Sequence, residues 1–241
     1  AAGEASAPDA RLACVTPSHH YPLGTVMSLP RRLAIIDWAS RRDGWVLEDD
    51  YDSEFRYRGR PLASLQGLDR GGRVIYAGSF SKVMFPSLRL GYLVVPEHLI
   101  GVFRAVRSAL DDHASLIAQP ALARFIDDGH FAAHIRRMRR LYAARQEALL
   151  EAGRRHLSGL LDLAPDDAGL HLVARLTSNT AARMDDREAA RRAAEAGVAA
   201  GALSAYRIRA PQPPGLVLGY AAVGEAEIAE AAAALGAALA P

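Results

Sequence analysis

The stretch GSFSKVMFPSLRLGY, residues 78–92, places one lysine and one arginine between a serine-containing turn and an apolar run. Arginine is abundant in this chain and lysine is scarce, so the position of Lys82 needs a chemical explanation. A lysine amine at the end of an apolar strand is costly to bury unless it is neutralised, paired or covalently used. Because lysine forms Schiff bases with carbonyl compounds, the stretch indicates covalent chemistry at Lys82, with a solvated surface lysine as the alternative.

The neighbours of Lys82 are suited to an anion. Ser79 and Ser81 offer hydroxyl groups and the N–H groups of a turn, which can surround a phosphate. Arg89 follows the lysine by seven residues and offers a planar fork of donors to the same anion. The sequence therefore predicts an anion site beside the reactive amine.

A second stretch, VLEDDYDSEFRY, ends an apolar strand with three consecutive acids. Strand alternation places Asp49 and Tyr51 on one face with Leu47, and Glu48 and Asp50 on the other. Open α/β sheets place ligand groups beyond the carboxyl ends of their strands. A carboxylate and a phenol in that position can hold a pyridinium nitrogen and a ring oxygen. The alternative is a solvated acidic loop.

Strand and helix patterns alternate through the first hundred residues. The predicted elements, in order, are LACVTP (strand), LPRRLAIIDWASRRDG (helix), and the strands WVLEDD, RVIYAGS and RLGYLVVP. The apolar runs are too continuous for a sheet with one buried face, so they predict a sheet buried inside an α/β domain. From about residue 97 the pattern is helical, and a smaller α/β unit follows with the strands GLHLVARL and PGLVLGYAAV.

Composition excludes several classes of protein. The formal net charge of +2 is too small to indicate a nucleic-acid or membrane partner by itself. No apolar run reaches the roughly 20 residues that cross a bilayer, and the N-terminus lacks the order of a signal peptide. The single cysteine, Cys14, excludes an internal disulfide framework and is typical of a reducing compartment. We therefore expect a soluble cytoplasmic protein with no membrane partner.

Taken together, GSFSK…LRLGY, EDDYDSEFRY and TPSHHYPLG resemble the aminotransferase-like domain of MocR-type regulators. These regulators are a branch of the GntR transcription factors, and their wider relatives are class I aminotransferases. The resemblance runs from about Leu12 to the C-terminus and includes HIRRMRRLYAAR, GLHLVARL and PGLVLGYA. It implies the α/β fold type I of aminotransferases that depend on pyridoxal 5′-phosphate (PLP). This chain would hold a partial large domain with an open, mainly parallel sheet, and a small C-terminal α/β domain.

The same resemblance divides the chain into four parts. Residues 1–11 are expected to be a linker or frayed lead-in, and residues 12–100 the C-terminal part of the PLP-binding large domain. Residues 101–155 are expected to form interdomain helices, and residues 156–241 the small domain. Because relatives begin upstream with a winged helix-turn-helix and more of the large domain, we expect a fragment or truncated product. A missing half supplied from elsewhere and a decayed gene are the alternatives.

The resemblance implies that Lys82 forms a Schiff base with PLP. Ser79 and Arg89 would bind the phosphate of the cofactor, and Ser81 is a weaker candidate for the same contact. No metal site is implied.

The resemblance also assigns contacts to the cofactor ring. Asp49 would pair with the pyridine nitrogen, and Tyr51 would hydrogen-bond the ring hydroxyl oxygen. Glu48 is the main rival for the role of the acid, because the spacing between acid and tyrosine varies in the family. Strand alternation favours Asp49.

The loop SHHYPLG resembles the loop that has the sequence Asn-Pro-Thr-Gly in class I enzymes. Tyr21 stands where those enzymes have an asparagine that contacts the ring, which makes Tyr21 a candidate contact in this chain. His19 or His20 is the alternative group for the ring, although a loop histidine is commonly just solvated.

One further departure concerns an arginine. Class I enzymes clamp a substrate carboxylate with an arginine in the strand that aligns with GLVLGYA, and this chain has none there. Arg175, Arg207 and Arg209 are candidates for that contact. The alternative is that YRIRAPQPPG is a solvated loop.

The basic segment HIRRMRRLYAARQ raises the question of DNA binding. Its arginines cover too wide an arc of the helix to form one stripe that faces a DNA groove, so we expect no direct DNA contact from this segment. These arginines are Arg136, Arg137, Arg139 and Arg140.

Three functions follow from these observations. The first is a PLP-binding domain that senses a small amino compound and signals to an attached DNA-binding module. The second is an aminotransferase, in which Lys82 would move a proton between substrate and cofactor. The third is a truncated chain without function. EDDYDSEFRY and the missing carboxylate arginine favour the first, and the resemblance implies a homodimer.

Overall fold

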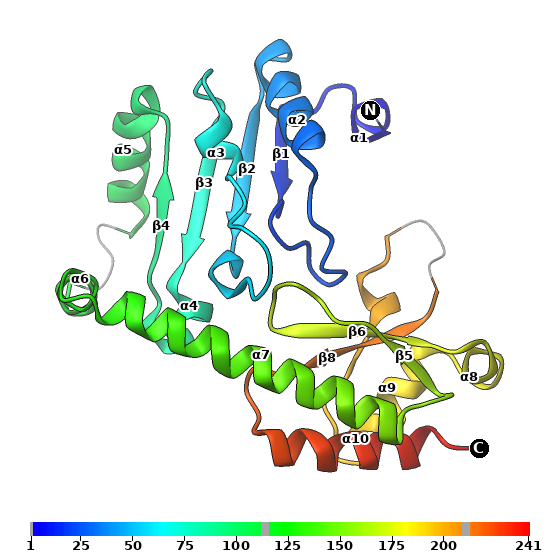
Figure 1. Ribbon diagram of the computed structural model, residues 1–241. Helices are drawn as coiled ribbons and strands as arrows, with labels where there is room; N and C mark the ends of the chain where they lie inside the picture. Colours follow the sequence, from blue (N-terminus) through cyan, green and yellow to red (C-terminus); the bar gives the residue numbers. More distant parts are fainter. Residues whose placement is uncertain (1, 112–115, 209–212) are drawn as a thin grey trace. The chain divides into compact units, whose positions relative to one another are not determined.

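The computed structural model describes residues 2–111, 116–208 and 213–241 (Figure 1). The chain divides into two units, each with its own sheet and helices. The first unit contains Ala1–His20, Thr25–Glu54 and Arg60–Ile135. The second contains Tyr21–Gly24, Phe55–Gly59 and Arg136–Pro241.

The sheet of the first unit is open and mainly parallel. Its order is β1-β2-β3-β4, in which β1, β2 and β3 are parallel and β4 is antiparallel to β3. The strands are β1 (Leu12–Val15), β2 (Trp45–Asp50), β3 (Val74–Ser79) and β4 (Gly91–Val94). Parallel neighbours need a crossover, which α2 supplies between β1 and β2. Pro30 lies in the first turn of α2, where its missing N–H costs no helical hydrogen bond.

The first unit also contains several helices. They are α1 (Ala2–Ser6), α2 (Leu29–Arg41), α3 (Leu65–Leu68), α4 (Phe80–Val83), α5 (Ile100–Asp111), α6 (Ala118–Asp127) and the 3-10 turns η1 (Ser53–Phe55), η2 (Pro86–Leu88) and η3 (Glu97–Leu99). The helix α7 (His130–His156) begins in the first unit and continues in the second. The helix and the four strands expected before residue 97 are all present.

Only one face of this sheet is packed. Ala39 of α2, Leu65 of α3, and Val46 and Val74 of the strands form a buried cluster. Alternation turns Leu12, Cys14 and Asp49 to the other face, and all three are exposed. The expectation of a sheet buried on both faces is therefore wrong for the described residues, because no described helix covers the second face. β4 and α5 likewise expose large apolar side chains: Leu93, Val94, Val102, Val106 and Leu110.

The second unit is built on an antiparallel sheet of order β5-β6-β8-β7. Its strands are β5 (Leu161–Leu163), β6 (His171–Leu176), β7 (Gly201–Ala202) and β8 (Gly215–Gly219). Its further helices are α8 (Ser178–Arg183), α9 (Asp186–Glu195), α10 (Glu225–Leu239) and the 3-10 turn η4 (Leu203–Tyr206). The small α/β unit expected at the C-terminal end is confirmed.

The core of the second unit joins α7, α10 and the sheet. Leu157, Leu216 and Leu235 are almost fully buried in one cluster. Tyr220, also fully buried, donates its hydroxyl to the Gly169 carbonyl oxygen at 2.8 Å and accepts from the Gln146 side chain at 3.0 Å. A buried phenol with both kinds of partner fixes β8 against α7 without an unsatisfied polar group.

Asp186 is a buried carboxylate that ties two separate segments to the start of α9. It is 2% exposed and accepts the backbone N–H groups of Ser204 at 2.8 Å and Gly215 at 3.2 Å. We expect Asp186→Ala to lower the free energy of unfolding by about 1–3 kcal/mol, because it leaves buried donors unsatisfied. Urea denaturation of this variant checks the prediction. The exposed acid Asp162, changed to alanine, serves as the control and is expected to have little effect.

No described helix is both long and apolar enough to span a membrane.

Candidate functional site

Five candidate residues come from one edge of the sheet in the first unit. The strands β1, β2 and β3 run parallel, so their carboxyl ends lie at the same edge. The structure places there Asp49, Tyr51, Ser79, Ser81 and Lys82. Because open α/β sheets bind ligands beyond these ends, this edge is the candidate site.

Lys82 lies in the short helix α4, directly after β3. It is exposed, and its amine has no hydrogen bond or ion pair with any residue that the structure describes. It is also the only lysine in the sequence. The segment forms a helix rather than the expected turn, because Ser79 caps it by accepting the Ser81 N–H at 3.1 Å and Met84 N–H donates to Phe80. An amine that is exposed and has no partner among the described residues is suited to covalent chemistry.

Arg89 ends the 3-10 turn η2, seven residues after Lys82. Its backbone is left-handed, with φ 51° and ψ 36°, which is uncommon for a residue other than glycine. The side chain is exposed, and within the described ranges its guanidinium has no hydrogen bond or ion pair. Arg89 therefore keeps all its donors available for an anion.

Glu48 already serves a structural purpose. It is fully buried, and its two carboxylate oxygens accept the backbone N–H groups of Leu65 and Gln66, each at 2.9 Å. These groups are orphan donors at the start of α3. Burial raises the pKa of Glu48, while the two N–H groups act in the opposite direction.

Asp49 has the opposite environment. It is exposed and forms no hydrogen bond or ion pair with another described residue. Partial burial, and then the negative charges of Asp50 and Asp52, raise the pKa of its carboxyl group. A nearby cation would offset this repulsion, so Asp49 is the acid of β2 that is available to a ligand.

The two acids are expected to respond differently to neutral substitutions. Glu48→Gln should lower the free energy of unfolding by about 1–3 kcal/mol, because an amide cannot accept both N–H groups. Asp49→Asn should leave stability nearly unchanged and should weaken protonation of a bound pyridine ring. Thermal denaturation and the absorption spectrum with added cofactor measure the two effects. A cofactor effect in Glu48→Gln alone would reverse the assignment.

A polar network that sequence reasoning missed lies on the other face of β2. The Asp50 carboxylate accepts the hydroxyl groups of Tyr76 at 2.8 Å and Ser53 at 2.6 Å. Burial and the hydrogen bond to Asp50 raise the pKa of Tyr76, which keeps its phenol protonated. The ring of Tyr92 crosses Gly78, where an added Cβ would lie 2.3 Å from the Tyr92 Cζ. The network therefore fixes the turn that follows β2.

His19 is buried beside Tyr51 and Asp52. It is 1% exposed, and its Nδ1 lies 2.8 Å from the Asp52 Oδ2, while Asp52 is also 1% exposed. The Tyr51 hydroxyl donates to the His19 carbonyl oxygen at 2.9 Å. The expectation of a solvated loop histidine holds for His20, which is exposed, and is wrong for His19.

Tyr21 belongs to the second unit. Its hydroxyl lies 2.9 Å from that of Tyr206, and its ring packs edge-on against His171, with 5.0 Å between centroids. Burial, and then Tyr206, raise the pKa of Tyr21 to about 12. Tyr21, Tyr206 and His171 all belong to the second unit.

The three candidate arginines for a carboxylate also fall outside the first unit. Arg175 donates to the Pro213 carbonyl oxygen at 2.7 Å, and Arg207 is exposed. Arg209 lies outside the described residues. The strand β8 holds no cation, because its sequence is GLVLG.

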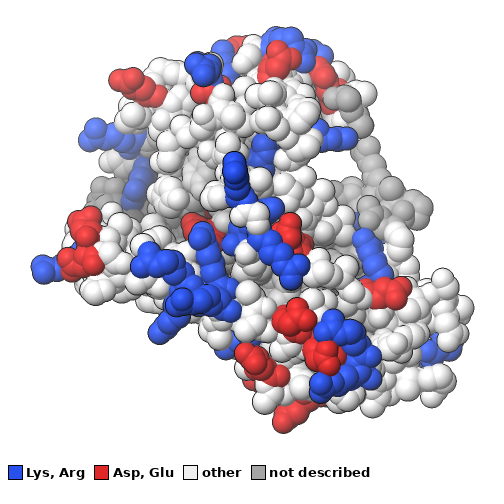
Figure 2. Space-filling view, in the orientation of Figure 1, with Lys and Arg blue, Asp and Glu red and all other residues white. Residues whose placement is uncertain are grey.

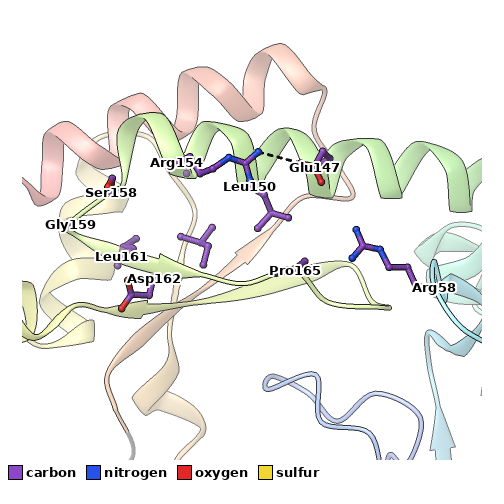
Figure 3. A pocket seen from close by; sticks show the side chains of 11 residues that line it. Arg58, Glu147, Leu150, Arg154, Ser158, Gly159, Leu161, Asp162 and Pro165 are labelled. Carbon is purple, nitrogen blue, oxygen red and sulfur yellow. Dashed lines mark hydrogen bonds and ion pairs between the residues drawn. The ribbon is translucent and has the colours of Figure 1, made fainter.

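A hollow of about 410 Å³ lies in the second unit, between α7 and β5 (Figure 3). Leu150 and Leu161 contribute apolar surface, and Arg154 pairs with Glu147 at 3.3 Å at its side. None of the candidate site residues lines it.

Some of the surface charges in the second unit form ion pairs along helices. Arg154 binds Glu151 at 2.6 Å on α7, and Arg191 binds Glu188 at 2.7 Å on α9. Figure 2 shows basic and acidic side chains lying next to one another on the face drawn. Among the residues that the structure describes, no group of three or more His, Cys, Asp and Glu side chains is placed to hold a metal ion.

Comparison with known proteins identifies the fold and the family. The family model for aminotransferase class I and II matches residues 5–235. A kynurenine aminotransferase of Pyrococcus horikoshii superposes with a TM-score of 0.83 and 28% sequence identity, over 95% of this chain and 56% of that one. The architecture is therefore the α/β aminotransferase fold type I, in partial form.

Regulatory proteins are also similar to this chain. It is 47% identical to the Probable rhizopine catabolism regulatory protein MocR of Rhizobium meliloti, over 90% of this chain and 43% of that protein. It is 39% identical to the Uncharacterized HTH-type transcriptional regulator YhdI of Bacillus subtilis, over 88% of this chain and 45% of that protein. The chain thus spans less than half the length of these relatives. It belongs to the class I and II aminotransferase family, with MocR-type regulators among its relatives.

Proposed function

We propose that this chain is the PLP-binding, effector-sensing domain of a MocR-type transcriptional regulator. The observation that carries the proposal is the amine of the only lysine, Lys82, which lies at the carboxyl edge of the sheet and has no partner among the described residues. The similarity to HTH-type regulators over about nine tenths of the chain supports regulation rather than metabolism.

The residues at this edge fit PLP by their chemistry. The cofactor has an aldehyde for an amine, a phosphate for hydroxyl and guanidinium donors, and a ring nitrogen that is stable as a cation beside a carboxylate. We assign the aldehyde to Lys82, the phosphate to Ser79, Ser81 and Arg89, and the nitrogen to Asp49. When bound, PLP would supply an electron sink for charge on the carbon next to the amine nitrogen.

Each assigned residue has a defined task in this proposal. Asp49 would hold the ring nitrogen protonated, because the ring cation would relieve repulsion from Asp50 and Asp52. Tyr51 would donate a hydrogen bond to the ring oxygen. Lys82 would hold the aldehyde, and its free amine would accept or donate a proton.

The proposal extends to the organisation of the protein. Residues 12–100 would form part of the cofactor-binding large domain, residues 101–155 the interdomain helices and residues 156–241 the small domain. A homodimer, a cytoplasmic location and DNA binding by a region outside this chain belong to the same proposal. The effector would be a small amino compound.

The test begins with the absorption spectrum of the purified chain after PLP is added and free cofactor is removed by desalting. We expect a retained visible band that changes when the right amino compound is added, with no steady formation of a keto product. Continuous keto-acid formation with an added amino acceptor would instead identify an aminotransferase. Complete loss of cofactor on desalting would favour a chain without function on its own.

A further inference from the structure

We propose that His19 and Asp52 are positioning residues, which hold the Tyr51 phenol in the orientation that the ring oxygen of the cofactor requires. The inference deepens the proposed function and rests on it for the identity of the ligand. The geometry of the three side chains does not depend on that identity.

The contact joins two loops at the carboxyl edge of the sheet. His19 follows β1, and Tyr51 and Asp52 follow β2. Tyr51 binds the backbone of His19, because its hydroxyl donates to the carbonyl oxygen at 2.9 Å. Asp52 binds the ring of the same residue, because its Oδ2 lies 2.8 Å from Nδ1. Two consecutive residues therefore hold one histidine at both its backbone and its ring.

The direction of the hydrogen bonds follows from the chemistry of the groups. A carboxylate oxygen accepts hydrogen bonds, so we assign the proton of this contact to Nδ1 of His19, which would donate it to Asp52. The Tyr51 hydroxyl oxygen lies 3.2 Å from the same Nδ1, which makes it a second, weaker acceptor for that proton. The phenol oxygen is thus held by His19 while its own proton is directed to the His19 carbonyl oxygen.

This arrangement prepares Tyr51 to donate to a ligand. A phenol hydroxyl rotates between two in-plane orientations, and a ring oxygen beside it would draw the proton away from the His19 carbonyl. The Nδ1–H would then support the phenol oxygen as it donates, and hydrogen bonds in such a chain strengthen one another. His19 and Asp52 act through Tyr51 and need not touch the ligand.

Burial indicates that the pair is more than a surface contact. Both side chains are 1% exposed, and burying a charged or hydrogen-bonded pair is costly in comparison with an apolar pair of similar size. Such a pair specifies one geometry, which catalytic and binding side chains require to within about 0.5 Å.

The first experiment uses the chain without cofactor. In the ¹⁵N NMR spectrum of the imidazole, His19 should carry its proton on Nδ1 in the wild type. Asp52→Asn should reduce that tautomer preference and speed exchange of the Tyr51 hydroxyl proton at least tenfold. His20→Asn, at the exposed neighbouring histidine, should change neither signal. These readouts do not require PLP, so their outcome is separate from that of the proposed function.

The second experiment uses the chain loaded with PLP and follows the visible band as a function of pH. Tyr51→Phe removes a donor to the anionic ring oxygen, so the midpoint of the titration should rise. Asp52→Asn and His19→Asn should also raise the midpoint, by less than Tyr51→Phe does but by at least a threefold change in proton affinity. In the Tyr51→Phe variant, the additional change Asp52→Asn should not shift the midpoint further.

Three results would overturn the inference. One is an unchanged Tyr51 hydroxyl exchange rate in Asp52→Asn. Another is a lower melting temperature in Asp52→Asn with an unchanged midpoint, which would indicate a purely structural pair. The last is an equal effect of Asp52→Asn with and without Tyr51. If Asp52→Asn does not fold, His19→Asn gives the same comparison.

Discussion

Replacing Lys82 with alanine is expected to abolish covalent binding of PLP completely. The amine of this side chain is the only one that lysine contributes to the sequence, so no second lysine can substitute for it. Borohydride reduction followed by mass spectrometry of peptides should find the adduct on Lys82 in the wild type and on no peptide of the variant. The visible band that survives desalting should disappear at the same time.

Lys82→Arg is the matched control for this result. Arginine preserves a positive charge on the exposed position of α4, and its guanidinium stays protonated and does not form the covalent bond. Both variants should therefore lose the adduct, while both keep the melting temperature of the wild type. An adduct that survives in either variant would place the cofactor elsewhere and refute the assignment of Lys82.

Arg32→Leu should produce the largest loss of stability in the first unit. Arg32 is 3% exposed and donates to the carbonyl oxygens of Pro17 at 2.6 Å, Ala63 at 2.8 Å and Met27 at 2.9 Å. Burial lowers its pKa, while the charges of Glu48 and Asp50 act in the opposite direction. Removing the cation leaves three buried carbonyl oxygens without this donor, each at a cost of about 1–3 kcal/mol, so we expect a total cost of about 3–5 kcal/mol.

Arg31→Leu provides the comparison, because Arg31 is the exposed neighbour on the same helix. That variant should change the free energy of unfolding by no more than about 0.5 kcal/mol. Urea denaturation monitored by circular dichroism measures both values. Similar, small effects of the two substitutions would mean that the carbonyl groups around Arg32 accept hydrogen bonds from water in the variant, which would contradict the prediction.

The strand that carries the acids, and the face on which each acid lies, could be predicted from the sequence. The strand predicted from WVLEDD is Trp45–Asp50 in the structure, and its alternation correctly separates buried Glu48 from exposed Asp49. Strand periodicity succeeds here because a side chain that faces a packed helix must be apolar or paired. The strands β5 and β7 were missed, since three and two residues are too few to show a period.

Contacts between residues that are far apart in the sequence could not be predicted from strand periodicity. His19 and Asp52 are 33 positions apart, and nothing in SHHYPLG indicates that one of its two histidines is buried. Only the register of β1 against β2 brings the two loops to one edge. The role of Glu48 was hidden for the same reason, because its partners at Leu65 and Gln66 belong to a helix 17 and 18 residues away.

The single exposed lysine in α4 also gives the protein an unusual proteolytic map. An endoproteinase that cleaves only after lysine has one target bond in the whole sequence, between Lys82 and Val83. Reductive fixation of a ligand on Lys82 removes that target, so a gel showing one band or two would report the fraction of chains that carry it. The same digestion separates Ala1–Lys82, with the acidic strand, from every residue of the second sheet.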